Sequence, residues 1–468
     1  GRAGGRGGAA VVEEGPPQQQ GQKRPPKAEV RPEVQPGGGA GKRARKGGDG
    51  SCSDPSTRYI ADPLAAPVVQ TARAYFAAHG LDLPVHCGPL QGWRTHAKLA
   101  VRRPPEAGAV GVRVGLFAPG THDVVEIPDC PAHHPAVNAA VAVVKRLCEA
   151  LGVQGYDDGD GSGELRYLAA TVERSTSRVQ LVLVWNALPP AEGEPLPQRL
   201  KRLRRALRAE DKADGMQPGF ALHSLWAHFQ GAWKHDNAIF GREAGSWRLL
   251  AGSPLLEEPL EAAYGAPAGE VSHLVRLRFG PNVFRQANLD AFALIVKAVR
   301  GSVASFDEGK RPRVVELYGG VGTIGLHLAD LVRSLACSDE NPHNEACFQA
   351  AADELRPKLR RRLAYTTAPA AQVASSGGLL GADLAVVDPP RKGLDREVLE
   401  ALRDPAGPRR LIYVSCGFAA FRRDAEELLS TSGGGWRLAQ AEGHVLFPGA
   451  DHLETLAVFD RVELGTVS

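Results

Sequence analysis

The sequence predicts an α/β protein in three parts: a disordered N-terminal tail, an α+β middle domain and a Rossmann-like, doubly wound C-terminal domain. Residues 1–55 are dominated by Gly, Pro, Gln and charged side chains. Apolar periodicity begins near residue 56, and from residue 276 short apolar strands alternate with helical segments. A glycine-rich turn after one of these strands favours a parallel sheet that binds a nucleotide. We therefore place the three parts at 1–55, 56–275 and 276–468.

The composition of the 468-residue chain limits the classes of protein to which it can belong. Its formal net charge is only +3, so a nucleic-acid surface must come from local clusters of basic residues. The seven cysteines include no CxxC pair and favour a reducing compartment. No apolar run approaches the roughly 18–20 residues that cross a bilayer, so we expect a soluble protein without membrane contact.

The tail has too few apolar side chains to offset the entropy of ordering, which predicts disorder. Its basic run, Lys42–Lys46, suits a nuclear signal, an arm that seeks phosphate, or a solvated run of charge. We assign it no catalytic role.

The middle domain shows the periods of a helix and several strands. Val68–His79 has helical spacing. The expected strands are Lys98–Arg103, Val110–Leu116, Leu165–Val172 and Val179–Val184. A charged insertion near 190–215 interrupts the pattern and contains Arg199, Lys201, Arg202, Arg204, Arg205 and Arg208. These basic residues suit either contact with a phosphate backbone or a solvated helix face.

The C-terminal domain opens with a strand, Arg313–Leu317, that runs into a glycine-rich turn. Gly320, Gly322 and Gly325 have the GxGxxG spacing, which permits a tight turn and close approach of the backbone to a ligand. A helix is expected over Ile324–Leu335.

An acid follows the next expected strand. Glu340 lies twenty residues beyond Gly320, where a carboxylate can accept hydrogen bonds from both hydroxyls of a ribose. The turn and the acid together predict a cofactor that contains adenosine. They leave NAD and S-adenosylmethionine as alternatives.

A further strand, Asp383–Val387, narrows this choice. It ends in Asp388-Pro389-Pro390-Arg391-Lys392-Gly393, at the edge of the sheet where ligands bind. The prolines fix the backbone, so that Asp388 and Arg391 are held at the boundary of cofactor and substrate. Such a turn is typical of methyltransferases that act on nucleobases, and a dehydrogenase needs none. An aromatic residue in place of Arg391 would favour methylation of an exocyclic amine, so the arginine argues against that chemistry.

A thiol and a carboxylate flank the last two expected strands. Cys416 follows Leu411–Ser415, and Glu454 stands just before Leu456–Val462. The pair suits a reaction in which a nucleophile adds to a ring and a base removes a ring proton, which indicates chemistry on a pyrimidine. Taken alone, a free cysteine is more often an inert buried thiol, and a glutamate is more often a surface carboxylate.

Five segments of the chain recur together in one family. They are Phe284-Arg285-Gln286-Ala287-Asn288, Glu316–Thr323, Asp388–Gly393, Ser415-Cys416 followed by Arg423-Asp424, and Phe447-Pro448 with His452-Leu453-Glu454. In this order and spacing they resemble the RNA uracil-5-methyltransferase family. The resemblance is strong over 279–461 and weaker over Gly92–Leu99 and Gly115–Cys130.

The resemblance implies a role for each catalytic residue. In this family a cysteine thiolate adds to C6 of uracil, C5 attacks the methyl group of S-adenosylmethionine, and a carboxylate removes the C5 proton. Cys416 matches the nucleophile and Glu454 the proton acceptor, with Asp388 and Arg391 beside them. His452 is in place to orient Glu454.

The resemblance also implies the cofactor and the substrate. The expected contacts to S-adenosylmethionine are Gln286, Tyr318, Gly320, Gly322, Thr323, Glu340 and Asp388. The substrate is expected to be a uridine flipped out of a tRNA or rRNA loop. Candidate stacking or phosphate contacts are Trp93, Arg94, Lys98, His122 and Trp226, although most tryptophans in such a domain belong to its core.

The chain departs from the family pattern in three places. Bacterial members often bind an iron–sulfur cluster through a CxxC pair and two further cysteines, and the lack of CxxC here predicts no cluster and no metal. The low-complexity tail does not suit the oligonucleotide-binding barrel of some members, which assigns RNA binding to the middle domain. Gly417-Phe418 replaces the usual Asn-Pro after the cysteine.

Two other functions explain parts of the sequence. The glycine turn alone fits an NAD-dependent oxidoreductase, which leaves Asp388–Gly393 and Cys416 unexplained. A non-catalytic RNA-binding protein or chaperone with a vestigial cofactor site is the other alternative, and the intact pair of Cys416 and Glu454 argues against it. We expect a monomer. The basic, Gly/Pro-rich extension favours a chloroplast or another organelle over the cytoplasm or nucleus.

Overall fold

The computed structural model describes residues 57–105, 110–118, 120–212, 220–231, 244–261, 274–307, 310–430 and 435–462. They all belong to one compact unit, Cys52–Ser468. The tail expected over 1–55, with its basic run, lies outside the described residues. Within the ranges given above, no helix is long and apolar enough to cross a membrane. In that same part of the chain, no three His, Cys, Asp or Glu side chains are grouped as metal ligands.

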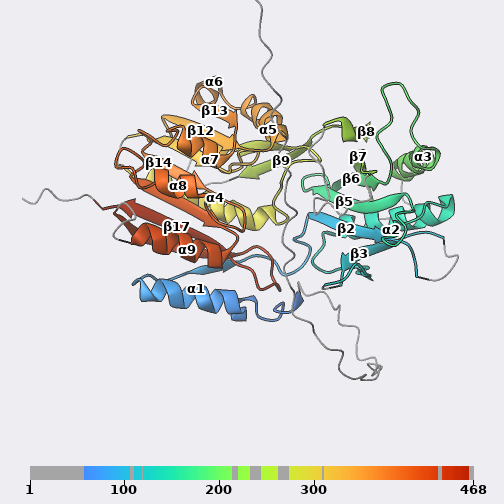
Figure 1. Ribbon diagram of the computed structural model, residues 1–468, viewed down its shortest axis with the longest axis horizontal. Coiled ribbons are helices and arrows are strands. Elements are labelled where there is room, and N and C mark those ends of the chain that lie inside the picture. Colours follow the sequence, from blue (N-terminus) through green and yellow to red (C-terminus); the bar gives the residue numbers. More distant parts are fainter. Residues whose placement is uncertain are drawn as a thin grey trace, which may run out of the picture. The chain divides into compact units, whose positions relative to one another are not determined.

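An eight-stranded sheet carries the C-terminal half of the chain (Figure 1). Its order is β1-β16-β17-β15-β14-β11-β12-β13. The strands are β1 (Val85–Cys87), β11 (Arg313–Leu317), β12 (Ser334–Asp339), β13 (Leu363–Thr367), β14 (Leu384–Val387), β15 (Arg410–Ser415), β16 (Trp436–Val445) and β17 (Glu454–Arg461). Neighbours from β15 to β13 are parallel, whereas β17 is antiparallel to β15 and β16.

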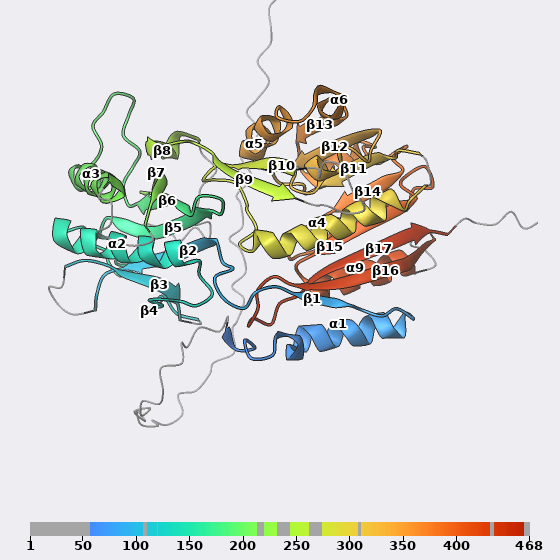
Figure 2. The ribbon, with the colours of Figure 1, turned by 180° about the vertical axis from the view of Figure 1, so that it is seen from behind.

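Helices cover both faces of this sheet (Figure 2). They are α1 (Pro67–Ala78), α4 (Leu289–Ala304), α5 (Pro342–Ala352), α6 (Pro357–Arg360), α7 (Ala370–Ser375), α8 (Arg396–Ala401) and α9 (Phe418–Leu429). One face shares a core with α4 and α5, and the other shares a core with α1, α7, α8 and α9. The predicted Rossmann-like, doubly wound fold is confirmed.

The helix α1 and the strand β1 come from the N-terminal end of the described residues and pack with this sheet. Val85 in β1 pairs with Gly443 in β16. Phe76 in α1 packs against Phe418 and Phe421 of α9, with ring centroids 6.3 and 5.8 Å apart. The eight-stranded sheet and its helices therefore include α1 and β1, which the prediction placed in the middle domain, because the apolar face of α1 is buried against α9.

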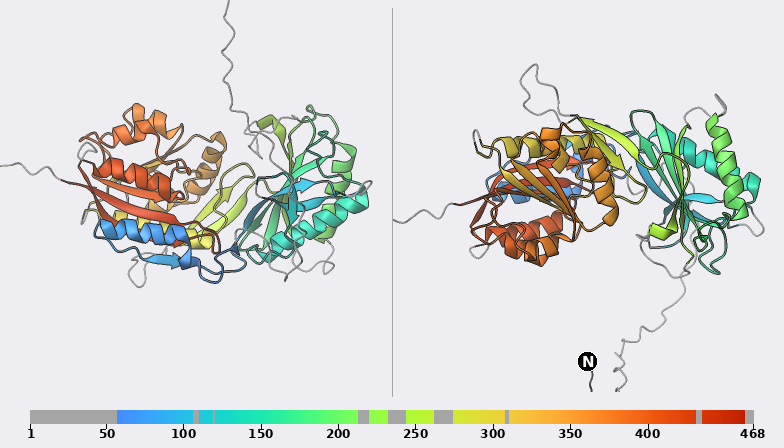
Figure 3. Two further views of the ribbon diagram at one scale, coloured as in Figure 1. Left: turned by 60° about the horizontal axis from the view of Figure 1, so that its bottom comes forward. Right: turned by 90° about the horizontal axis from the view of Figure 1, so that it is seen from above.

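A seven-stranded sheet is formed by the middle of the chain, in the order β4-β3-β2-β5-β6-β7-β8. Its strands are β2 (His96–Arg102), β3 (Arg113–Phe117), β4 (Val124–Glu126), β5 (Leu165–Glu173), β6 (Arg178–Trp185), β7 (Leu222–Phe229) and β8 (Trp247–Gly252). The helices α2 (Pro135–Leu151) and α3 (Gln198–Lys212) share one core with it, and Figure 3 shows both on the same side of the sheet. The expected α+β character is confirmed.

A separate antiparallel pair, β9 (Leu256–Glu261) and β10 (Leu274–Phe279), leads into α4. Its apolar side chains, among them Leu256 and Phe279, belong to the core around α4 and α5. The pair therefore packs with the eight-stranded sheet.

The charged insertion forms the amphipathic helix α3. Leu200, Leu203 and Leu207 are buried at helical spacing, whereas Arg202 and Arg205 are exposed. The solvated helix face considered for this segment therefore exists, and whether it meets RNA stays a prediction.

The prediction of a helix over Ile324–Leu335 is wrong. Only Gly325–Leu328 forms a short 3-10 helix, η4, and β12 begins soon after it. The ring nitrogens of His327 lie 2.6 Å from the carbonyl oxygen of Thr323 and 3.0 Å from that of Leu260. The His327 side chain thus bonds to the Thr323 carbonyl oxygen, which in an α-helix would accept a backbone N–H.

Candidate active site

A cavity of about 550 Å³ opens at the carboxyl ends of β11, β14 and β15. The sequence-predicted residues that line it are Gln286, Tyr318, Gly320, Glu340, Asp388, Arg391, Cys416 and Glu454. They come from separate segments, and a parallel sheet brings them together because its strand ends meet at one edge. The volume is typical of a small-molecule site, which spans roughly 300–1,000 Å³.

Cys416 is held between a strand and a helix. β15 ends at Ser415, and α9 begins at Phe418 after the N-cap Gly417. The Gly417 N–H donates to Ser415 Oγ at 3.2 Å. A Cβ atom at 417 would lie 2.9 Å from the carbonyl oxygen of Arg391. Glycine in place of the family's usual Asn therefore accompanies a close approach of the cysteine loop to the Arg391 turn.

The electrostatic surroundings of Cys416 oppose its ionisation. Burial raises the pKa of the thiol to about 11, and the nearby Glu454 and Asp388 carboxyls add to the rise. Arg391 acts in the other direction. At neutral pH the thiol is therefore protonated, and a base must take its proton before the sulfur can act as a nucleophile.

Two buried carboxyls beside this thiol also have raised pKa values. Glu454, the first residue of β17, is 2% exposed. Burial, helped by Asp388, raises the pKa of Glu454 to about 8, and Arg391 lowers it. Burial, helped by Glu316, raises the pKa of Asp388 to about 7. Both groups can therefore exchange protons near neutral pH.

His452 lines the same cavity. Its Nε2 lies 4.0 Å from Glu454 Oε1, which is longer than a hydrogen bond. Burial lowers the pKa of His452 to about 4, so the ring is neutral at physiological pH. His452 and Glu454 therefore share no direct hydrogen bond, and the orienting role of His452 stays a prediction.

Asp424 supports the turn that follows Asp388. Its fully buried carboxylate accepts the N–H of Leu394 at 2.8 Å. Arg423, its neighbour, donates to the carbonyl oxygen of Lys392 at 2.7 Å. The Arg423-Asp424 motif thus fixes the backbone that presents Asp388 to the cavity.

Asp339, which the sequence analysis missed, organises the glycine turn. It accepts the N–H of Gly320 at 3.1 Å, the N–H of Asn341 at 2.8 Å and the side-chain amide of Asn344 at 2.9 Å. The missed lining residues include Asp339, Asn341, Asn344, Lys392 and Asp395. One sequence signal was available: Asn341 before Pro342 is typical of a helix N-terminus, and Asn341 caps α5.

Tyr318 adopts a conformation that is unusual for a residue with a side chain. Its φ is +58°, and its hydroxyl donates to Asp395 Oδ2 at 2.9 Å. Strained backbone of this kind occurs preferentially at functional sites. Tyr318 also lines the cavity, as expected for a cofactor contact.

Gly322 and Thr323 are the two predicted cofactor contacts that do not line the cavity. Gly322 has a φ of +78°, and a Cβ there would lie 2.4 Å from the ring of Phe348. Its place in the motif is therefore explained by packing of the turn against α5. Direct contact of either residue with the cofactor stays a prediction.

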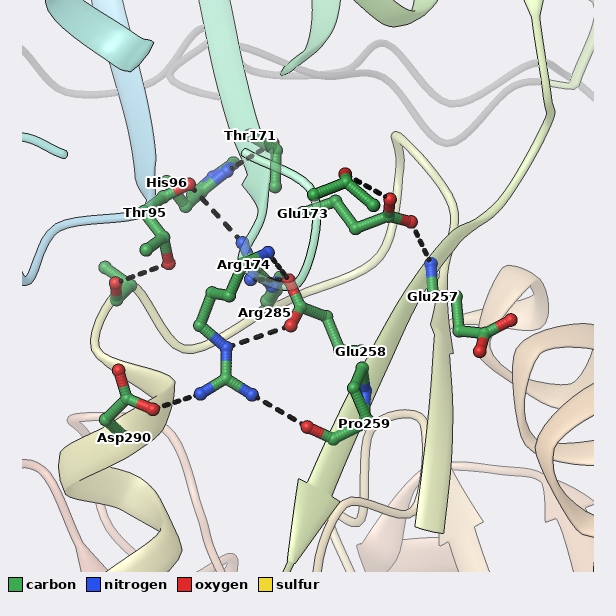
Figure 4. A network of polar contacts seen from close by, with 12 residues as sticks. Thr95, His96, Thr171, Glu173, Arg174, Glu257, Glu258, Pro259, Arg285 and Asp290 are labelled. Atoms are coloured by element: carbon green, nitrogen blue, oxygen red, sulfur yellow. Dashed lines mark hydrogen bonds and ion pairs between the residues drawn. The ribbon is translucent and has the colours of Figure 1, made fainter. Parts of the chain in front are cut away.

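The buried Arg285 and the partly exposed Arg174 share one buried carboxylate next to the cavity, that of Glu258 (Figure 4). Arg174 Nε lies 2.9 Å from Glu258 Oε2, and the Arg174 main-chain N–H donates to Oε1 at 3.1 Å. Arg285 pairs with the same carboxylate and is 4% exposed. Arg285 stands between Phe284 and Gln286, which both line the cavity. The network therefore anchors a segment of the cavity wall.

The same segment is bonded to the seven-stranded sheet. Thr95, just before β2, donates its N–H at 2.8 Å and its hydroxyl at 3.0 Å to the carbonyl of Ala287. Arg285 donates to the Thr95 carbonyl at 3.4 Å. The two residues that flank Gln286 in the sequence, Arg285 and Ala287, are thus both hydrogen-bonded to Thr95.

The five candidate RNA contacts lie in different surroundings. Trp93 is 5% exposed and packs edge-on against Phe447, a cavity-lining residue. The Arg94 guanidinium lies over both rings, 5.1 and 5.5 Å from their centroids. The other candidates, Lys98, His122 and Trp226, belong to the seven-stranded sheet or to its edge loops.

Comparison with known proteins identifies the family. An uncharacterized RNA methyltransferase of Protochlamydia amoebophila is 35% identical over 404 residues, which make up 86% of this chain and 94% of the relative. The chain belongs to the RNA methyltransferase family. An RNA methyltransferase, the enzyme class implied by the motifs, is thereby confirmed.

Further similarities agree with this assignment. An uncharacterized RNA methyltransferase of Thermosynechococcus vestitus is 28% identical over 362 residues, 74% of this chain and 68% of the relative. The crystal structure of the Pyrococcus abyssi tRNA (uracil-54, C5)-methyltransferase in complex with S-adenosyl-L-homocysteine has a TM-score of 0.59. The match covers 84% of this chain and 82% of that one at 20% identity, which shows a shared fold. No family model matches the chain.

The cavity of this RNA methyltransferase suits its cofactor. Asp388 and Glu454 are buried carboxyls whose pKa values are raised by burial and by neighbouring carboxyls. The sulfonium of S-adenosylmethionine carries one positive charge, which would favour their ionised forms. The NAD alternative explains neither these carboxyls nor the family assignment.

Proposed function

We propose that this RNA methyltransferase makes 5-methyluridine, with Cys416 as the nucleophile and Glu454 as the proton acceptor. The supporting observation is that both side chains line one cavity, together with Asp388 and Arg391. Methylation of a nitrogen or an oxygen needs no protein nucleophile. C5 of a neutral uracil is a poor nucleophile, and addition of a thiolate to the ring activates it.

The first step is ionisation of Cys416. We assign Asp388 as the acceptor of the thiol proton, because its carboxyl lines the same cavity as Cys416 and acts on the thiol, and Glu454 is needed for the C5 proton. Arg391, whose charge lowers the pKa of the thiol, stabilises the thiolate. The sulfur then bonds to C6, and the electron pair of the C5–C6 double bond passes to C5 and O4 as an enolate.

S-adenosylmethionine, held in the cavity that Gln286, Tyr318 and Asp388 line, would supply an electrophilic methyl group for C5 and would depart as S-adenosylhomocysteine. Glu454 removes the remaining C5 proton. The C–H electron pair restores the C5–C6 double bond as the C6–S bond breaks, and Cys416 leaves as a thiolate. A pKa near 8 allows Glu454 to take this proton and later to release it to solvent.

The substrate is expected to be a uridine that leaves its base stack. Glu454 is 2% exposed and Cys416 is only half-buried, so the reacting ring must enter the cavity to meet both. Enzymes that act on a base in this way flip it from the helix or take it from a loop. The Pyrococcus relative is named for uracil-54 of tRNA, and this makes tRNA the first RNA to test.

The test is to incubate the full chain with methyl-labelled S-adenosylmethionine and total RNA that lacks 5-methyluridine, followed by mass spectrometry of the nucleosides. We expect label in 5-methyluridine, and none with Cys416→Ala. Cys87→Ala is the matched control, because Cys87 is exposed and does not line the cavity. Label in a different nucleoside, or 5-methyluridine formed by Cys416→Ala, would contradict the proposal. No label in spite of cofactor binding would favour the non-catalytic alternative.

A further inference from the structure

The helices α2 and α3 both pack against the same face of the seven-stranded sheet. The core that α2 and α3 share with the sheet contains Leu99, Leu168, Leu183 and Ala227, one residue from each of four adjacent strands. Neighbouring residues along each strand point to the opposite side. A separate cluster on that side consists of Ala169, Val182, Trp226 and Trp247, all from strands. We call this side of the sheet the outer face.

The strand register places two rows of side chains across the outer face. The first row is Lys98, Ala169, Val182, Trp226 and Leu249. The second row is Ala100, Tyr167, Val184, His228 and Trp247. Lys98 and Trp226, which are far apart in the sequence, therefore belong to one row. Phe117 of β3 extends the surface, with its ring centroid 6.4 Å from that of Tyr167.

The outer face combines aromatic rings with basic groups. Phe117 is 36% exposed, the His122 side chain beside it is 56% exposed, and Lys98 is exposed. Tyr167 and Trp226 are half-buried. Neither row contains an Asp or a Glu. The surface therefore offers ring faces and the Lys98 ammonium group. The rows contain no carboxylate, and the neighbouring Asp158 lies against Arg102 and His122.

Arg102 stacks against two rings at the edge of this face, those of Phe117 and Tyr167. Its guanidinium carbon lies 4.9 Å from the ring centroid of Phe117 and 5.2 Å from that of Tyr167. Asp158 pairs with Arg102 and balances its charge. The rings are thus ordered before a ligand arrives, which lowers the entropic cost of binding.

We propose that the outer face binds single-stranded RNA, with bases stacked on Phe117, Tyr167 and Trp226 and a phosphate contacted by Lys98. Stacking on aromatic rings beside a basic groove is the usual way in which proteins bind single strands. Ala100 and Ala169 lie between the larger side chains of the rows. Both alanines are buried, so the stacking surface is made by the exposed parts of the three rings.

RNA suits this surface better than a protein partner does. The aliphatic members Ala169, Val182 and Val184 are buried, and Leu249, at the end of the first row, is 41% exposed. One exposed leucine does not form a continuous aliphatic patch, and the rest of the exposed face is aromatic or basic. The inference rests on the proposed function only in taking a single-stranded loop as the substrate. The surface would hold the strand that flanks the flipped uridine.

The experiment measures fluorescence anisotropy of labelled single-stranded oligouridylate bound to the full chain with S-adenosylhomocysteine. A matched probe is an abasic ribose–phosphate oligomer of the same length. Phe117→Leu should weaken binding of oligouridylate about tenfold, because it keeps apolar bulk and loses the ring. Phe117→Tyr should bind as the wild type does. Neither change should affect the abasic oligomer.

The charge contact is tested separately. Lys98→Met should weaken binding of both oligomers and reduce the slope of log K against log salt by about 0.7, the value for one contact to a single strand. Leu188→Ala, at a residue 78% exposed outside the outer face, should change nothing. The assay involves no methyl transfer, so a failure to form 5-methyluridine would leave its result standing.

Wild-type affinity of Phe117→Leu for oligouridylate would overturn the proposal and would favour a protein partner for this face. An equal loss for the abasic oligomer would also overturn it, since stacking requires bases. Thermal unfolding of each variant controls for folding. If Phe117→Leu unfolds, the pair Trp226→Leu and Trp226→Phe gives the same comparison in the middle of the first row.

Discussion

Cys416 and Glu454 lie across from each other at the ends of two hydrogen-bonded strands. Ser415 pairs with Thr455 in the antiparallel register of β15 and β17, and Cys416 and Glu454 are the next residues along. This neighbourhood explains why the Glu454 carboxyl raises the pKa of the Cys416 thiol. The nucleophile and the base therefore titrate as a coupled pair, and a change in one alters the other.

Glu454→Gln should lower the pKa of Cys416 from its value of about 11, because it removes a negative charge beside the thiolate. The rate of alkylation of Cys416 by iodoacetamide, followed by peptide mass spectrometry at pH 7–10, measures this shift. The variant should react faster above about pH 8, where the wild-type Glu454 carboxyl is ionised, and at nearly the wild-type rate at pH 7. Glu397→Gln, at an exposed residue of α8, serves as the control. An unchanged rate profile for Glu454→Gln would contradict the coupling.

The stability of the protein should depend on Glu454 with a defined sign. Its folded pKa of about 8 lies above the ordinary value of 4.5, so the unfolded chain loses this proton first as pH rises. The contribution of Glu454 to stability therefore falls between about pH 4.5 and pH 8. Glu454→Gln should gain a few kcal/mol relative to wild type between pH 5 and pH 8.5. Urea unfolding at both pH values checks this, and a constant difference would be the contrary result.

The network of Figure 4 predicts a separation of stability from cofactor binding. Glu258→Gln leaves Arg285 buried without its anion, whereas the partly exposed Arg174 keeps Asp290, and the change should cost about 3–5 kcal/mol in urea unfolding. Replacing all three by Met removes the buried charges and should restore most of that stability. Because Arg285 anchors Gln286, the triple variant should still bind S-adenosylmethionine more weakly in calorimetry. Wild-type cofactor affinity would show that the network serves stability alone.

Two glycines of one turn should respond differently to alanine. A Cβ at 322 would lie 2.4 Å from the Phe348 ring, whereas a Cβ at 320 meets nothing within 4 Å. Both residues have positive φ, so each Ala costs about 1 kcal/mol from the backbone. Gly322→Ala should cost roughly 1–3 kcal/mol more, through overpacking. Equal unfolding free energies for the two variants would count against the packing role of Gly322.

Local patterns in the sequence were enough to predict the strands that position the chemistry. β11 has the expected bounds, Arg313–Leu317, and Cys416 and Glu454 stand at the ends of their strands. These positions follow from short apolar runs bounded by Gly, Pro or charge, which depend little on distant partners. The resemblance then supplied the roles that residue types alone left open.

Features that depend on long-range contacts were not predictable in this way. The segment after η4 joins the sheet as β12, paired with β11 and β13, although its sequence has an apolar pattern that suits a helix. Glu258 is an ordinary glutamate in the sequence, and only the fold brings it between Arg174 and Arg285. The assignment of α1 to the C-terminal sheet likewise depends on a partner helix near the other end of the chain.

The most direct test of the account uses RNA in which 5-fluorouridine replaces uridine. Fluorine at C5 cannot be removed as a proton, so the bond between Cys416 and C6 should persist after methyl transfer. We predict a protein–RNA adduct that survives denaturing electrophoresis, requires S-adenosylmethionine, and maps by mass spectrometry to the peptide that contains Cys416. An adduct at another residue, or methylation of normal RNA with no adduct on the fluorinated RNA, would contradict the central claim.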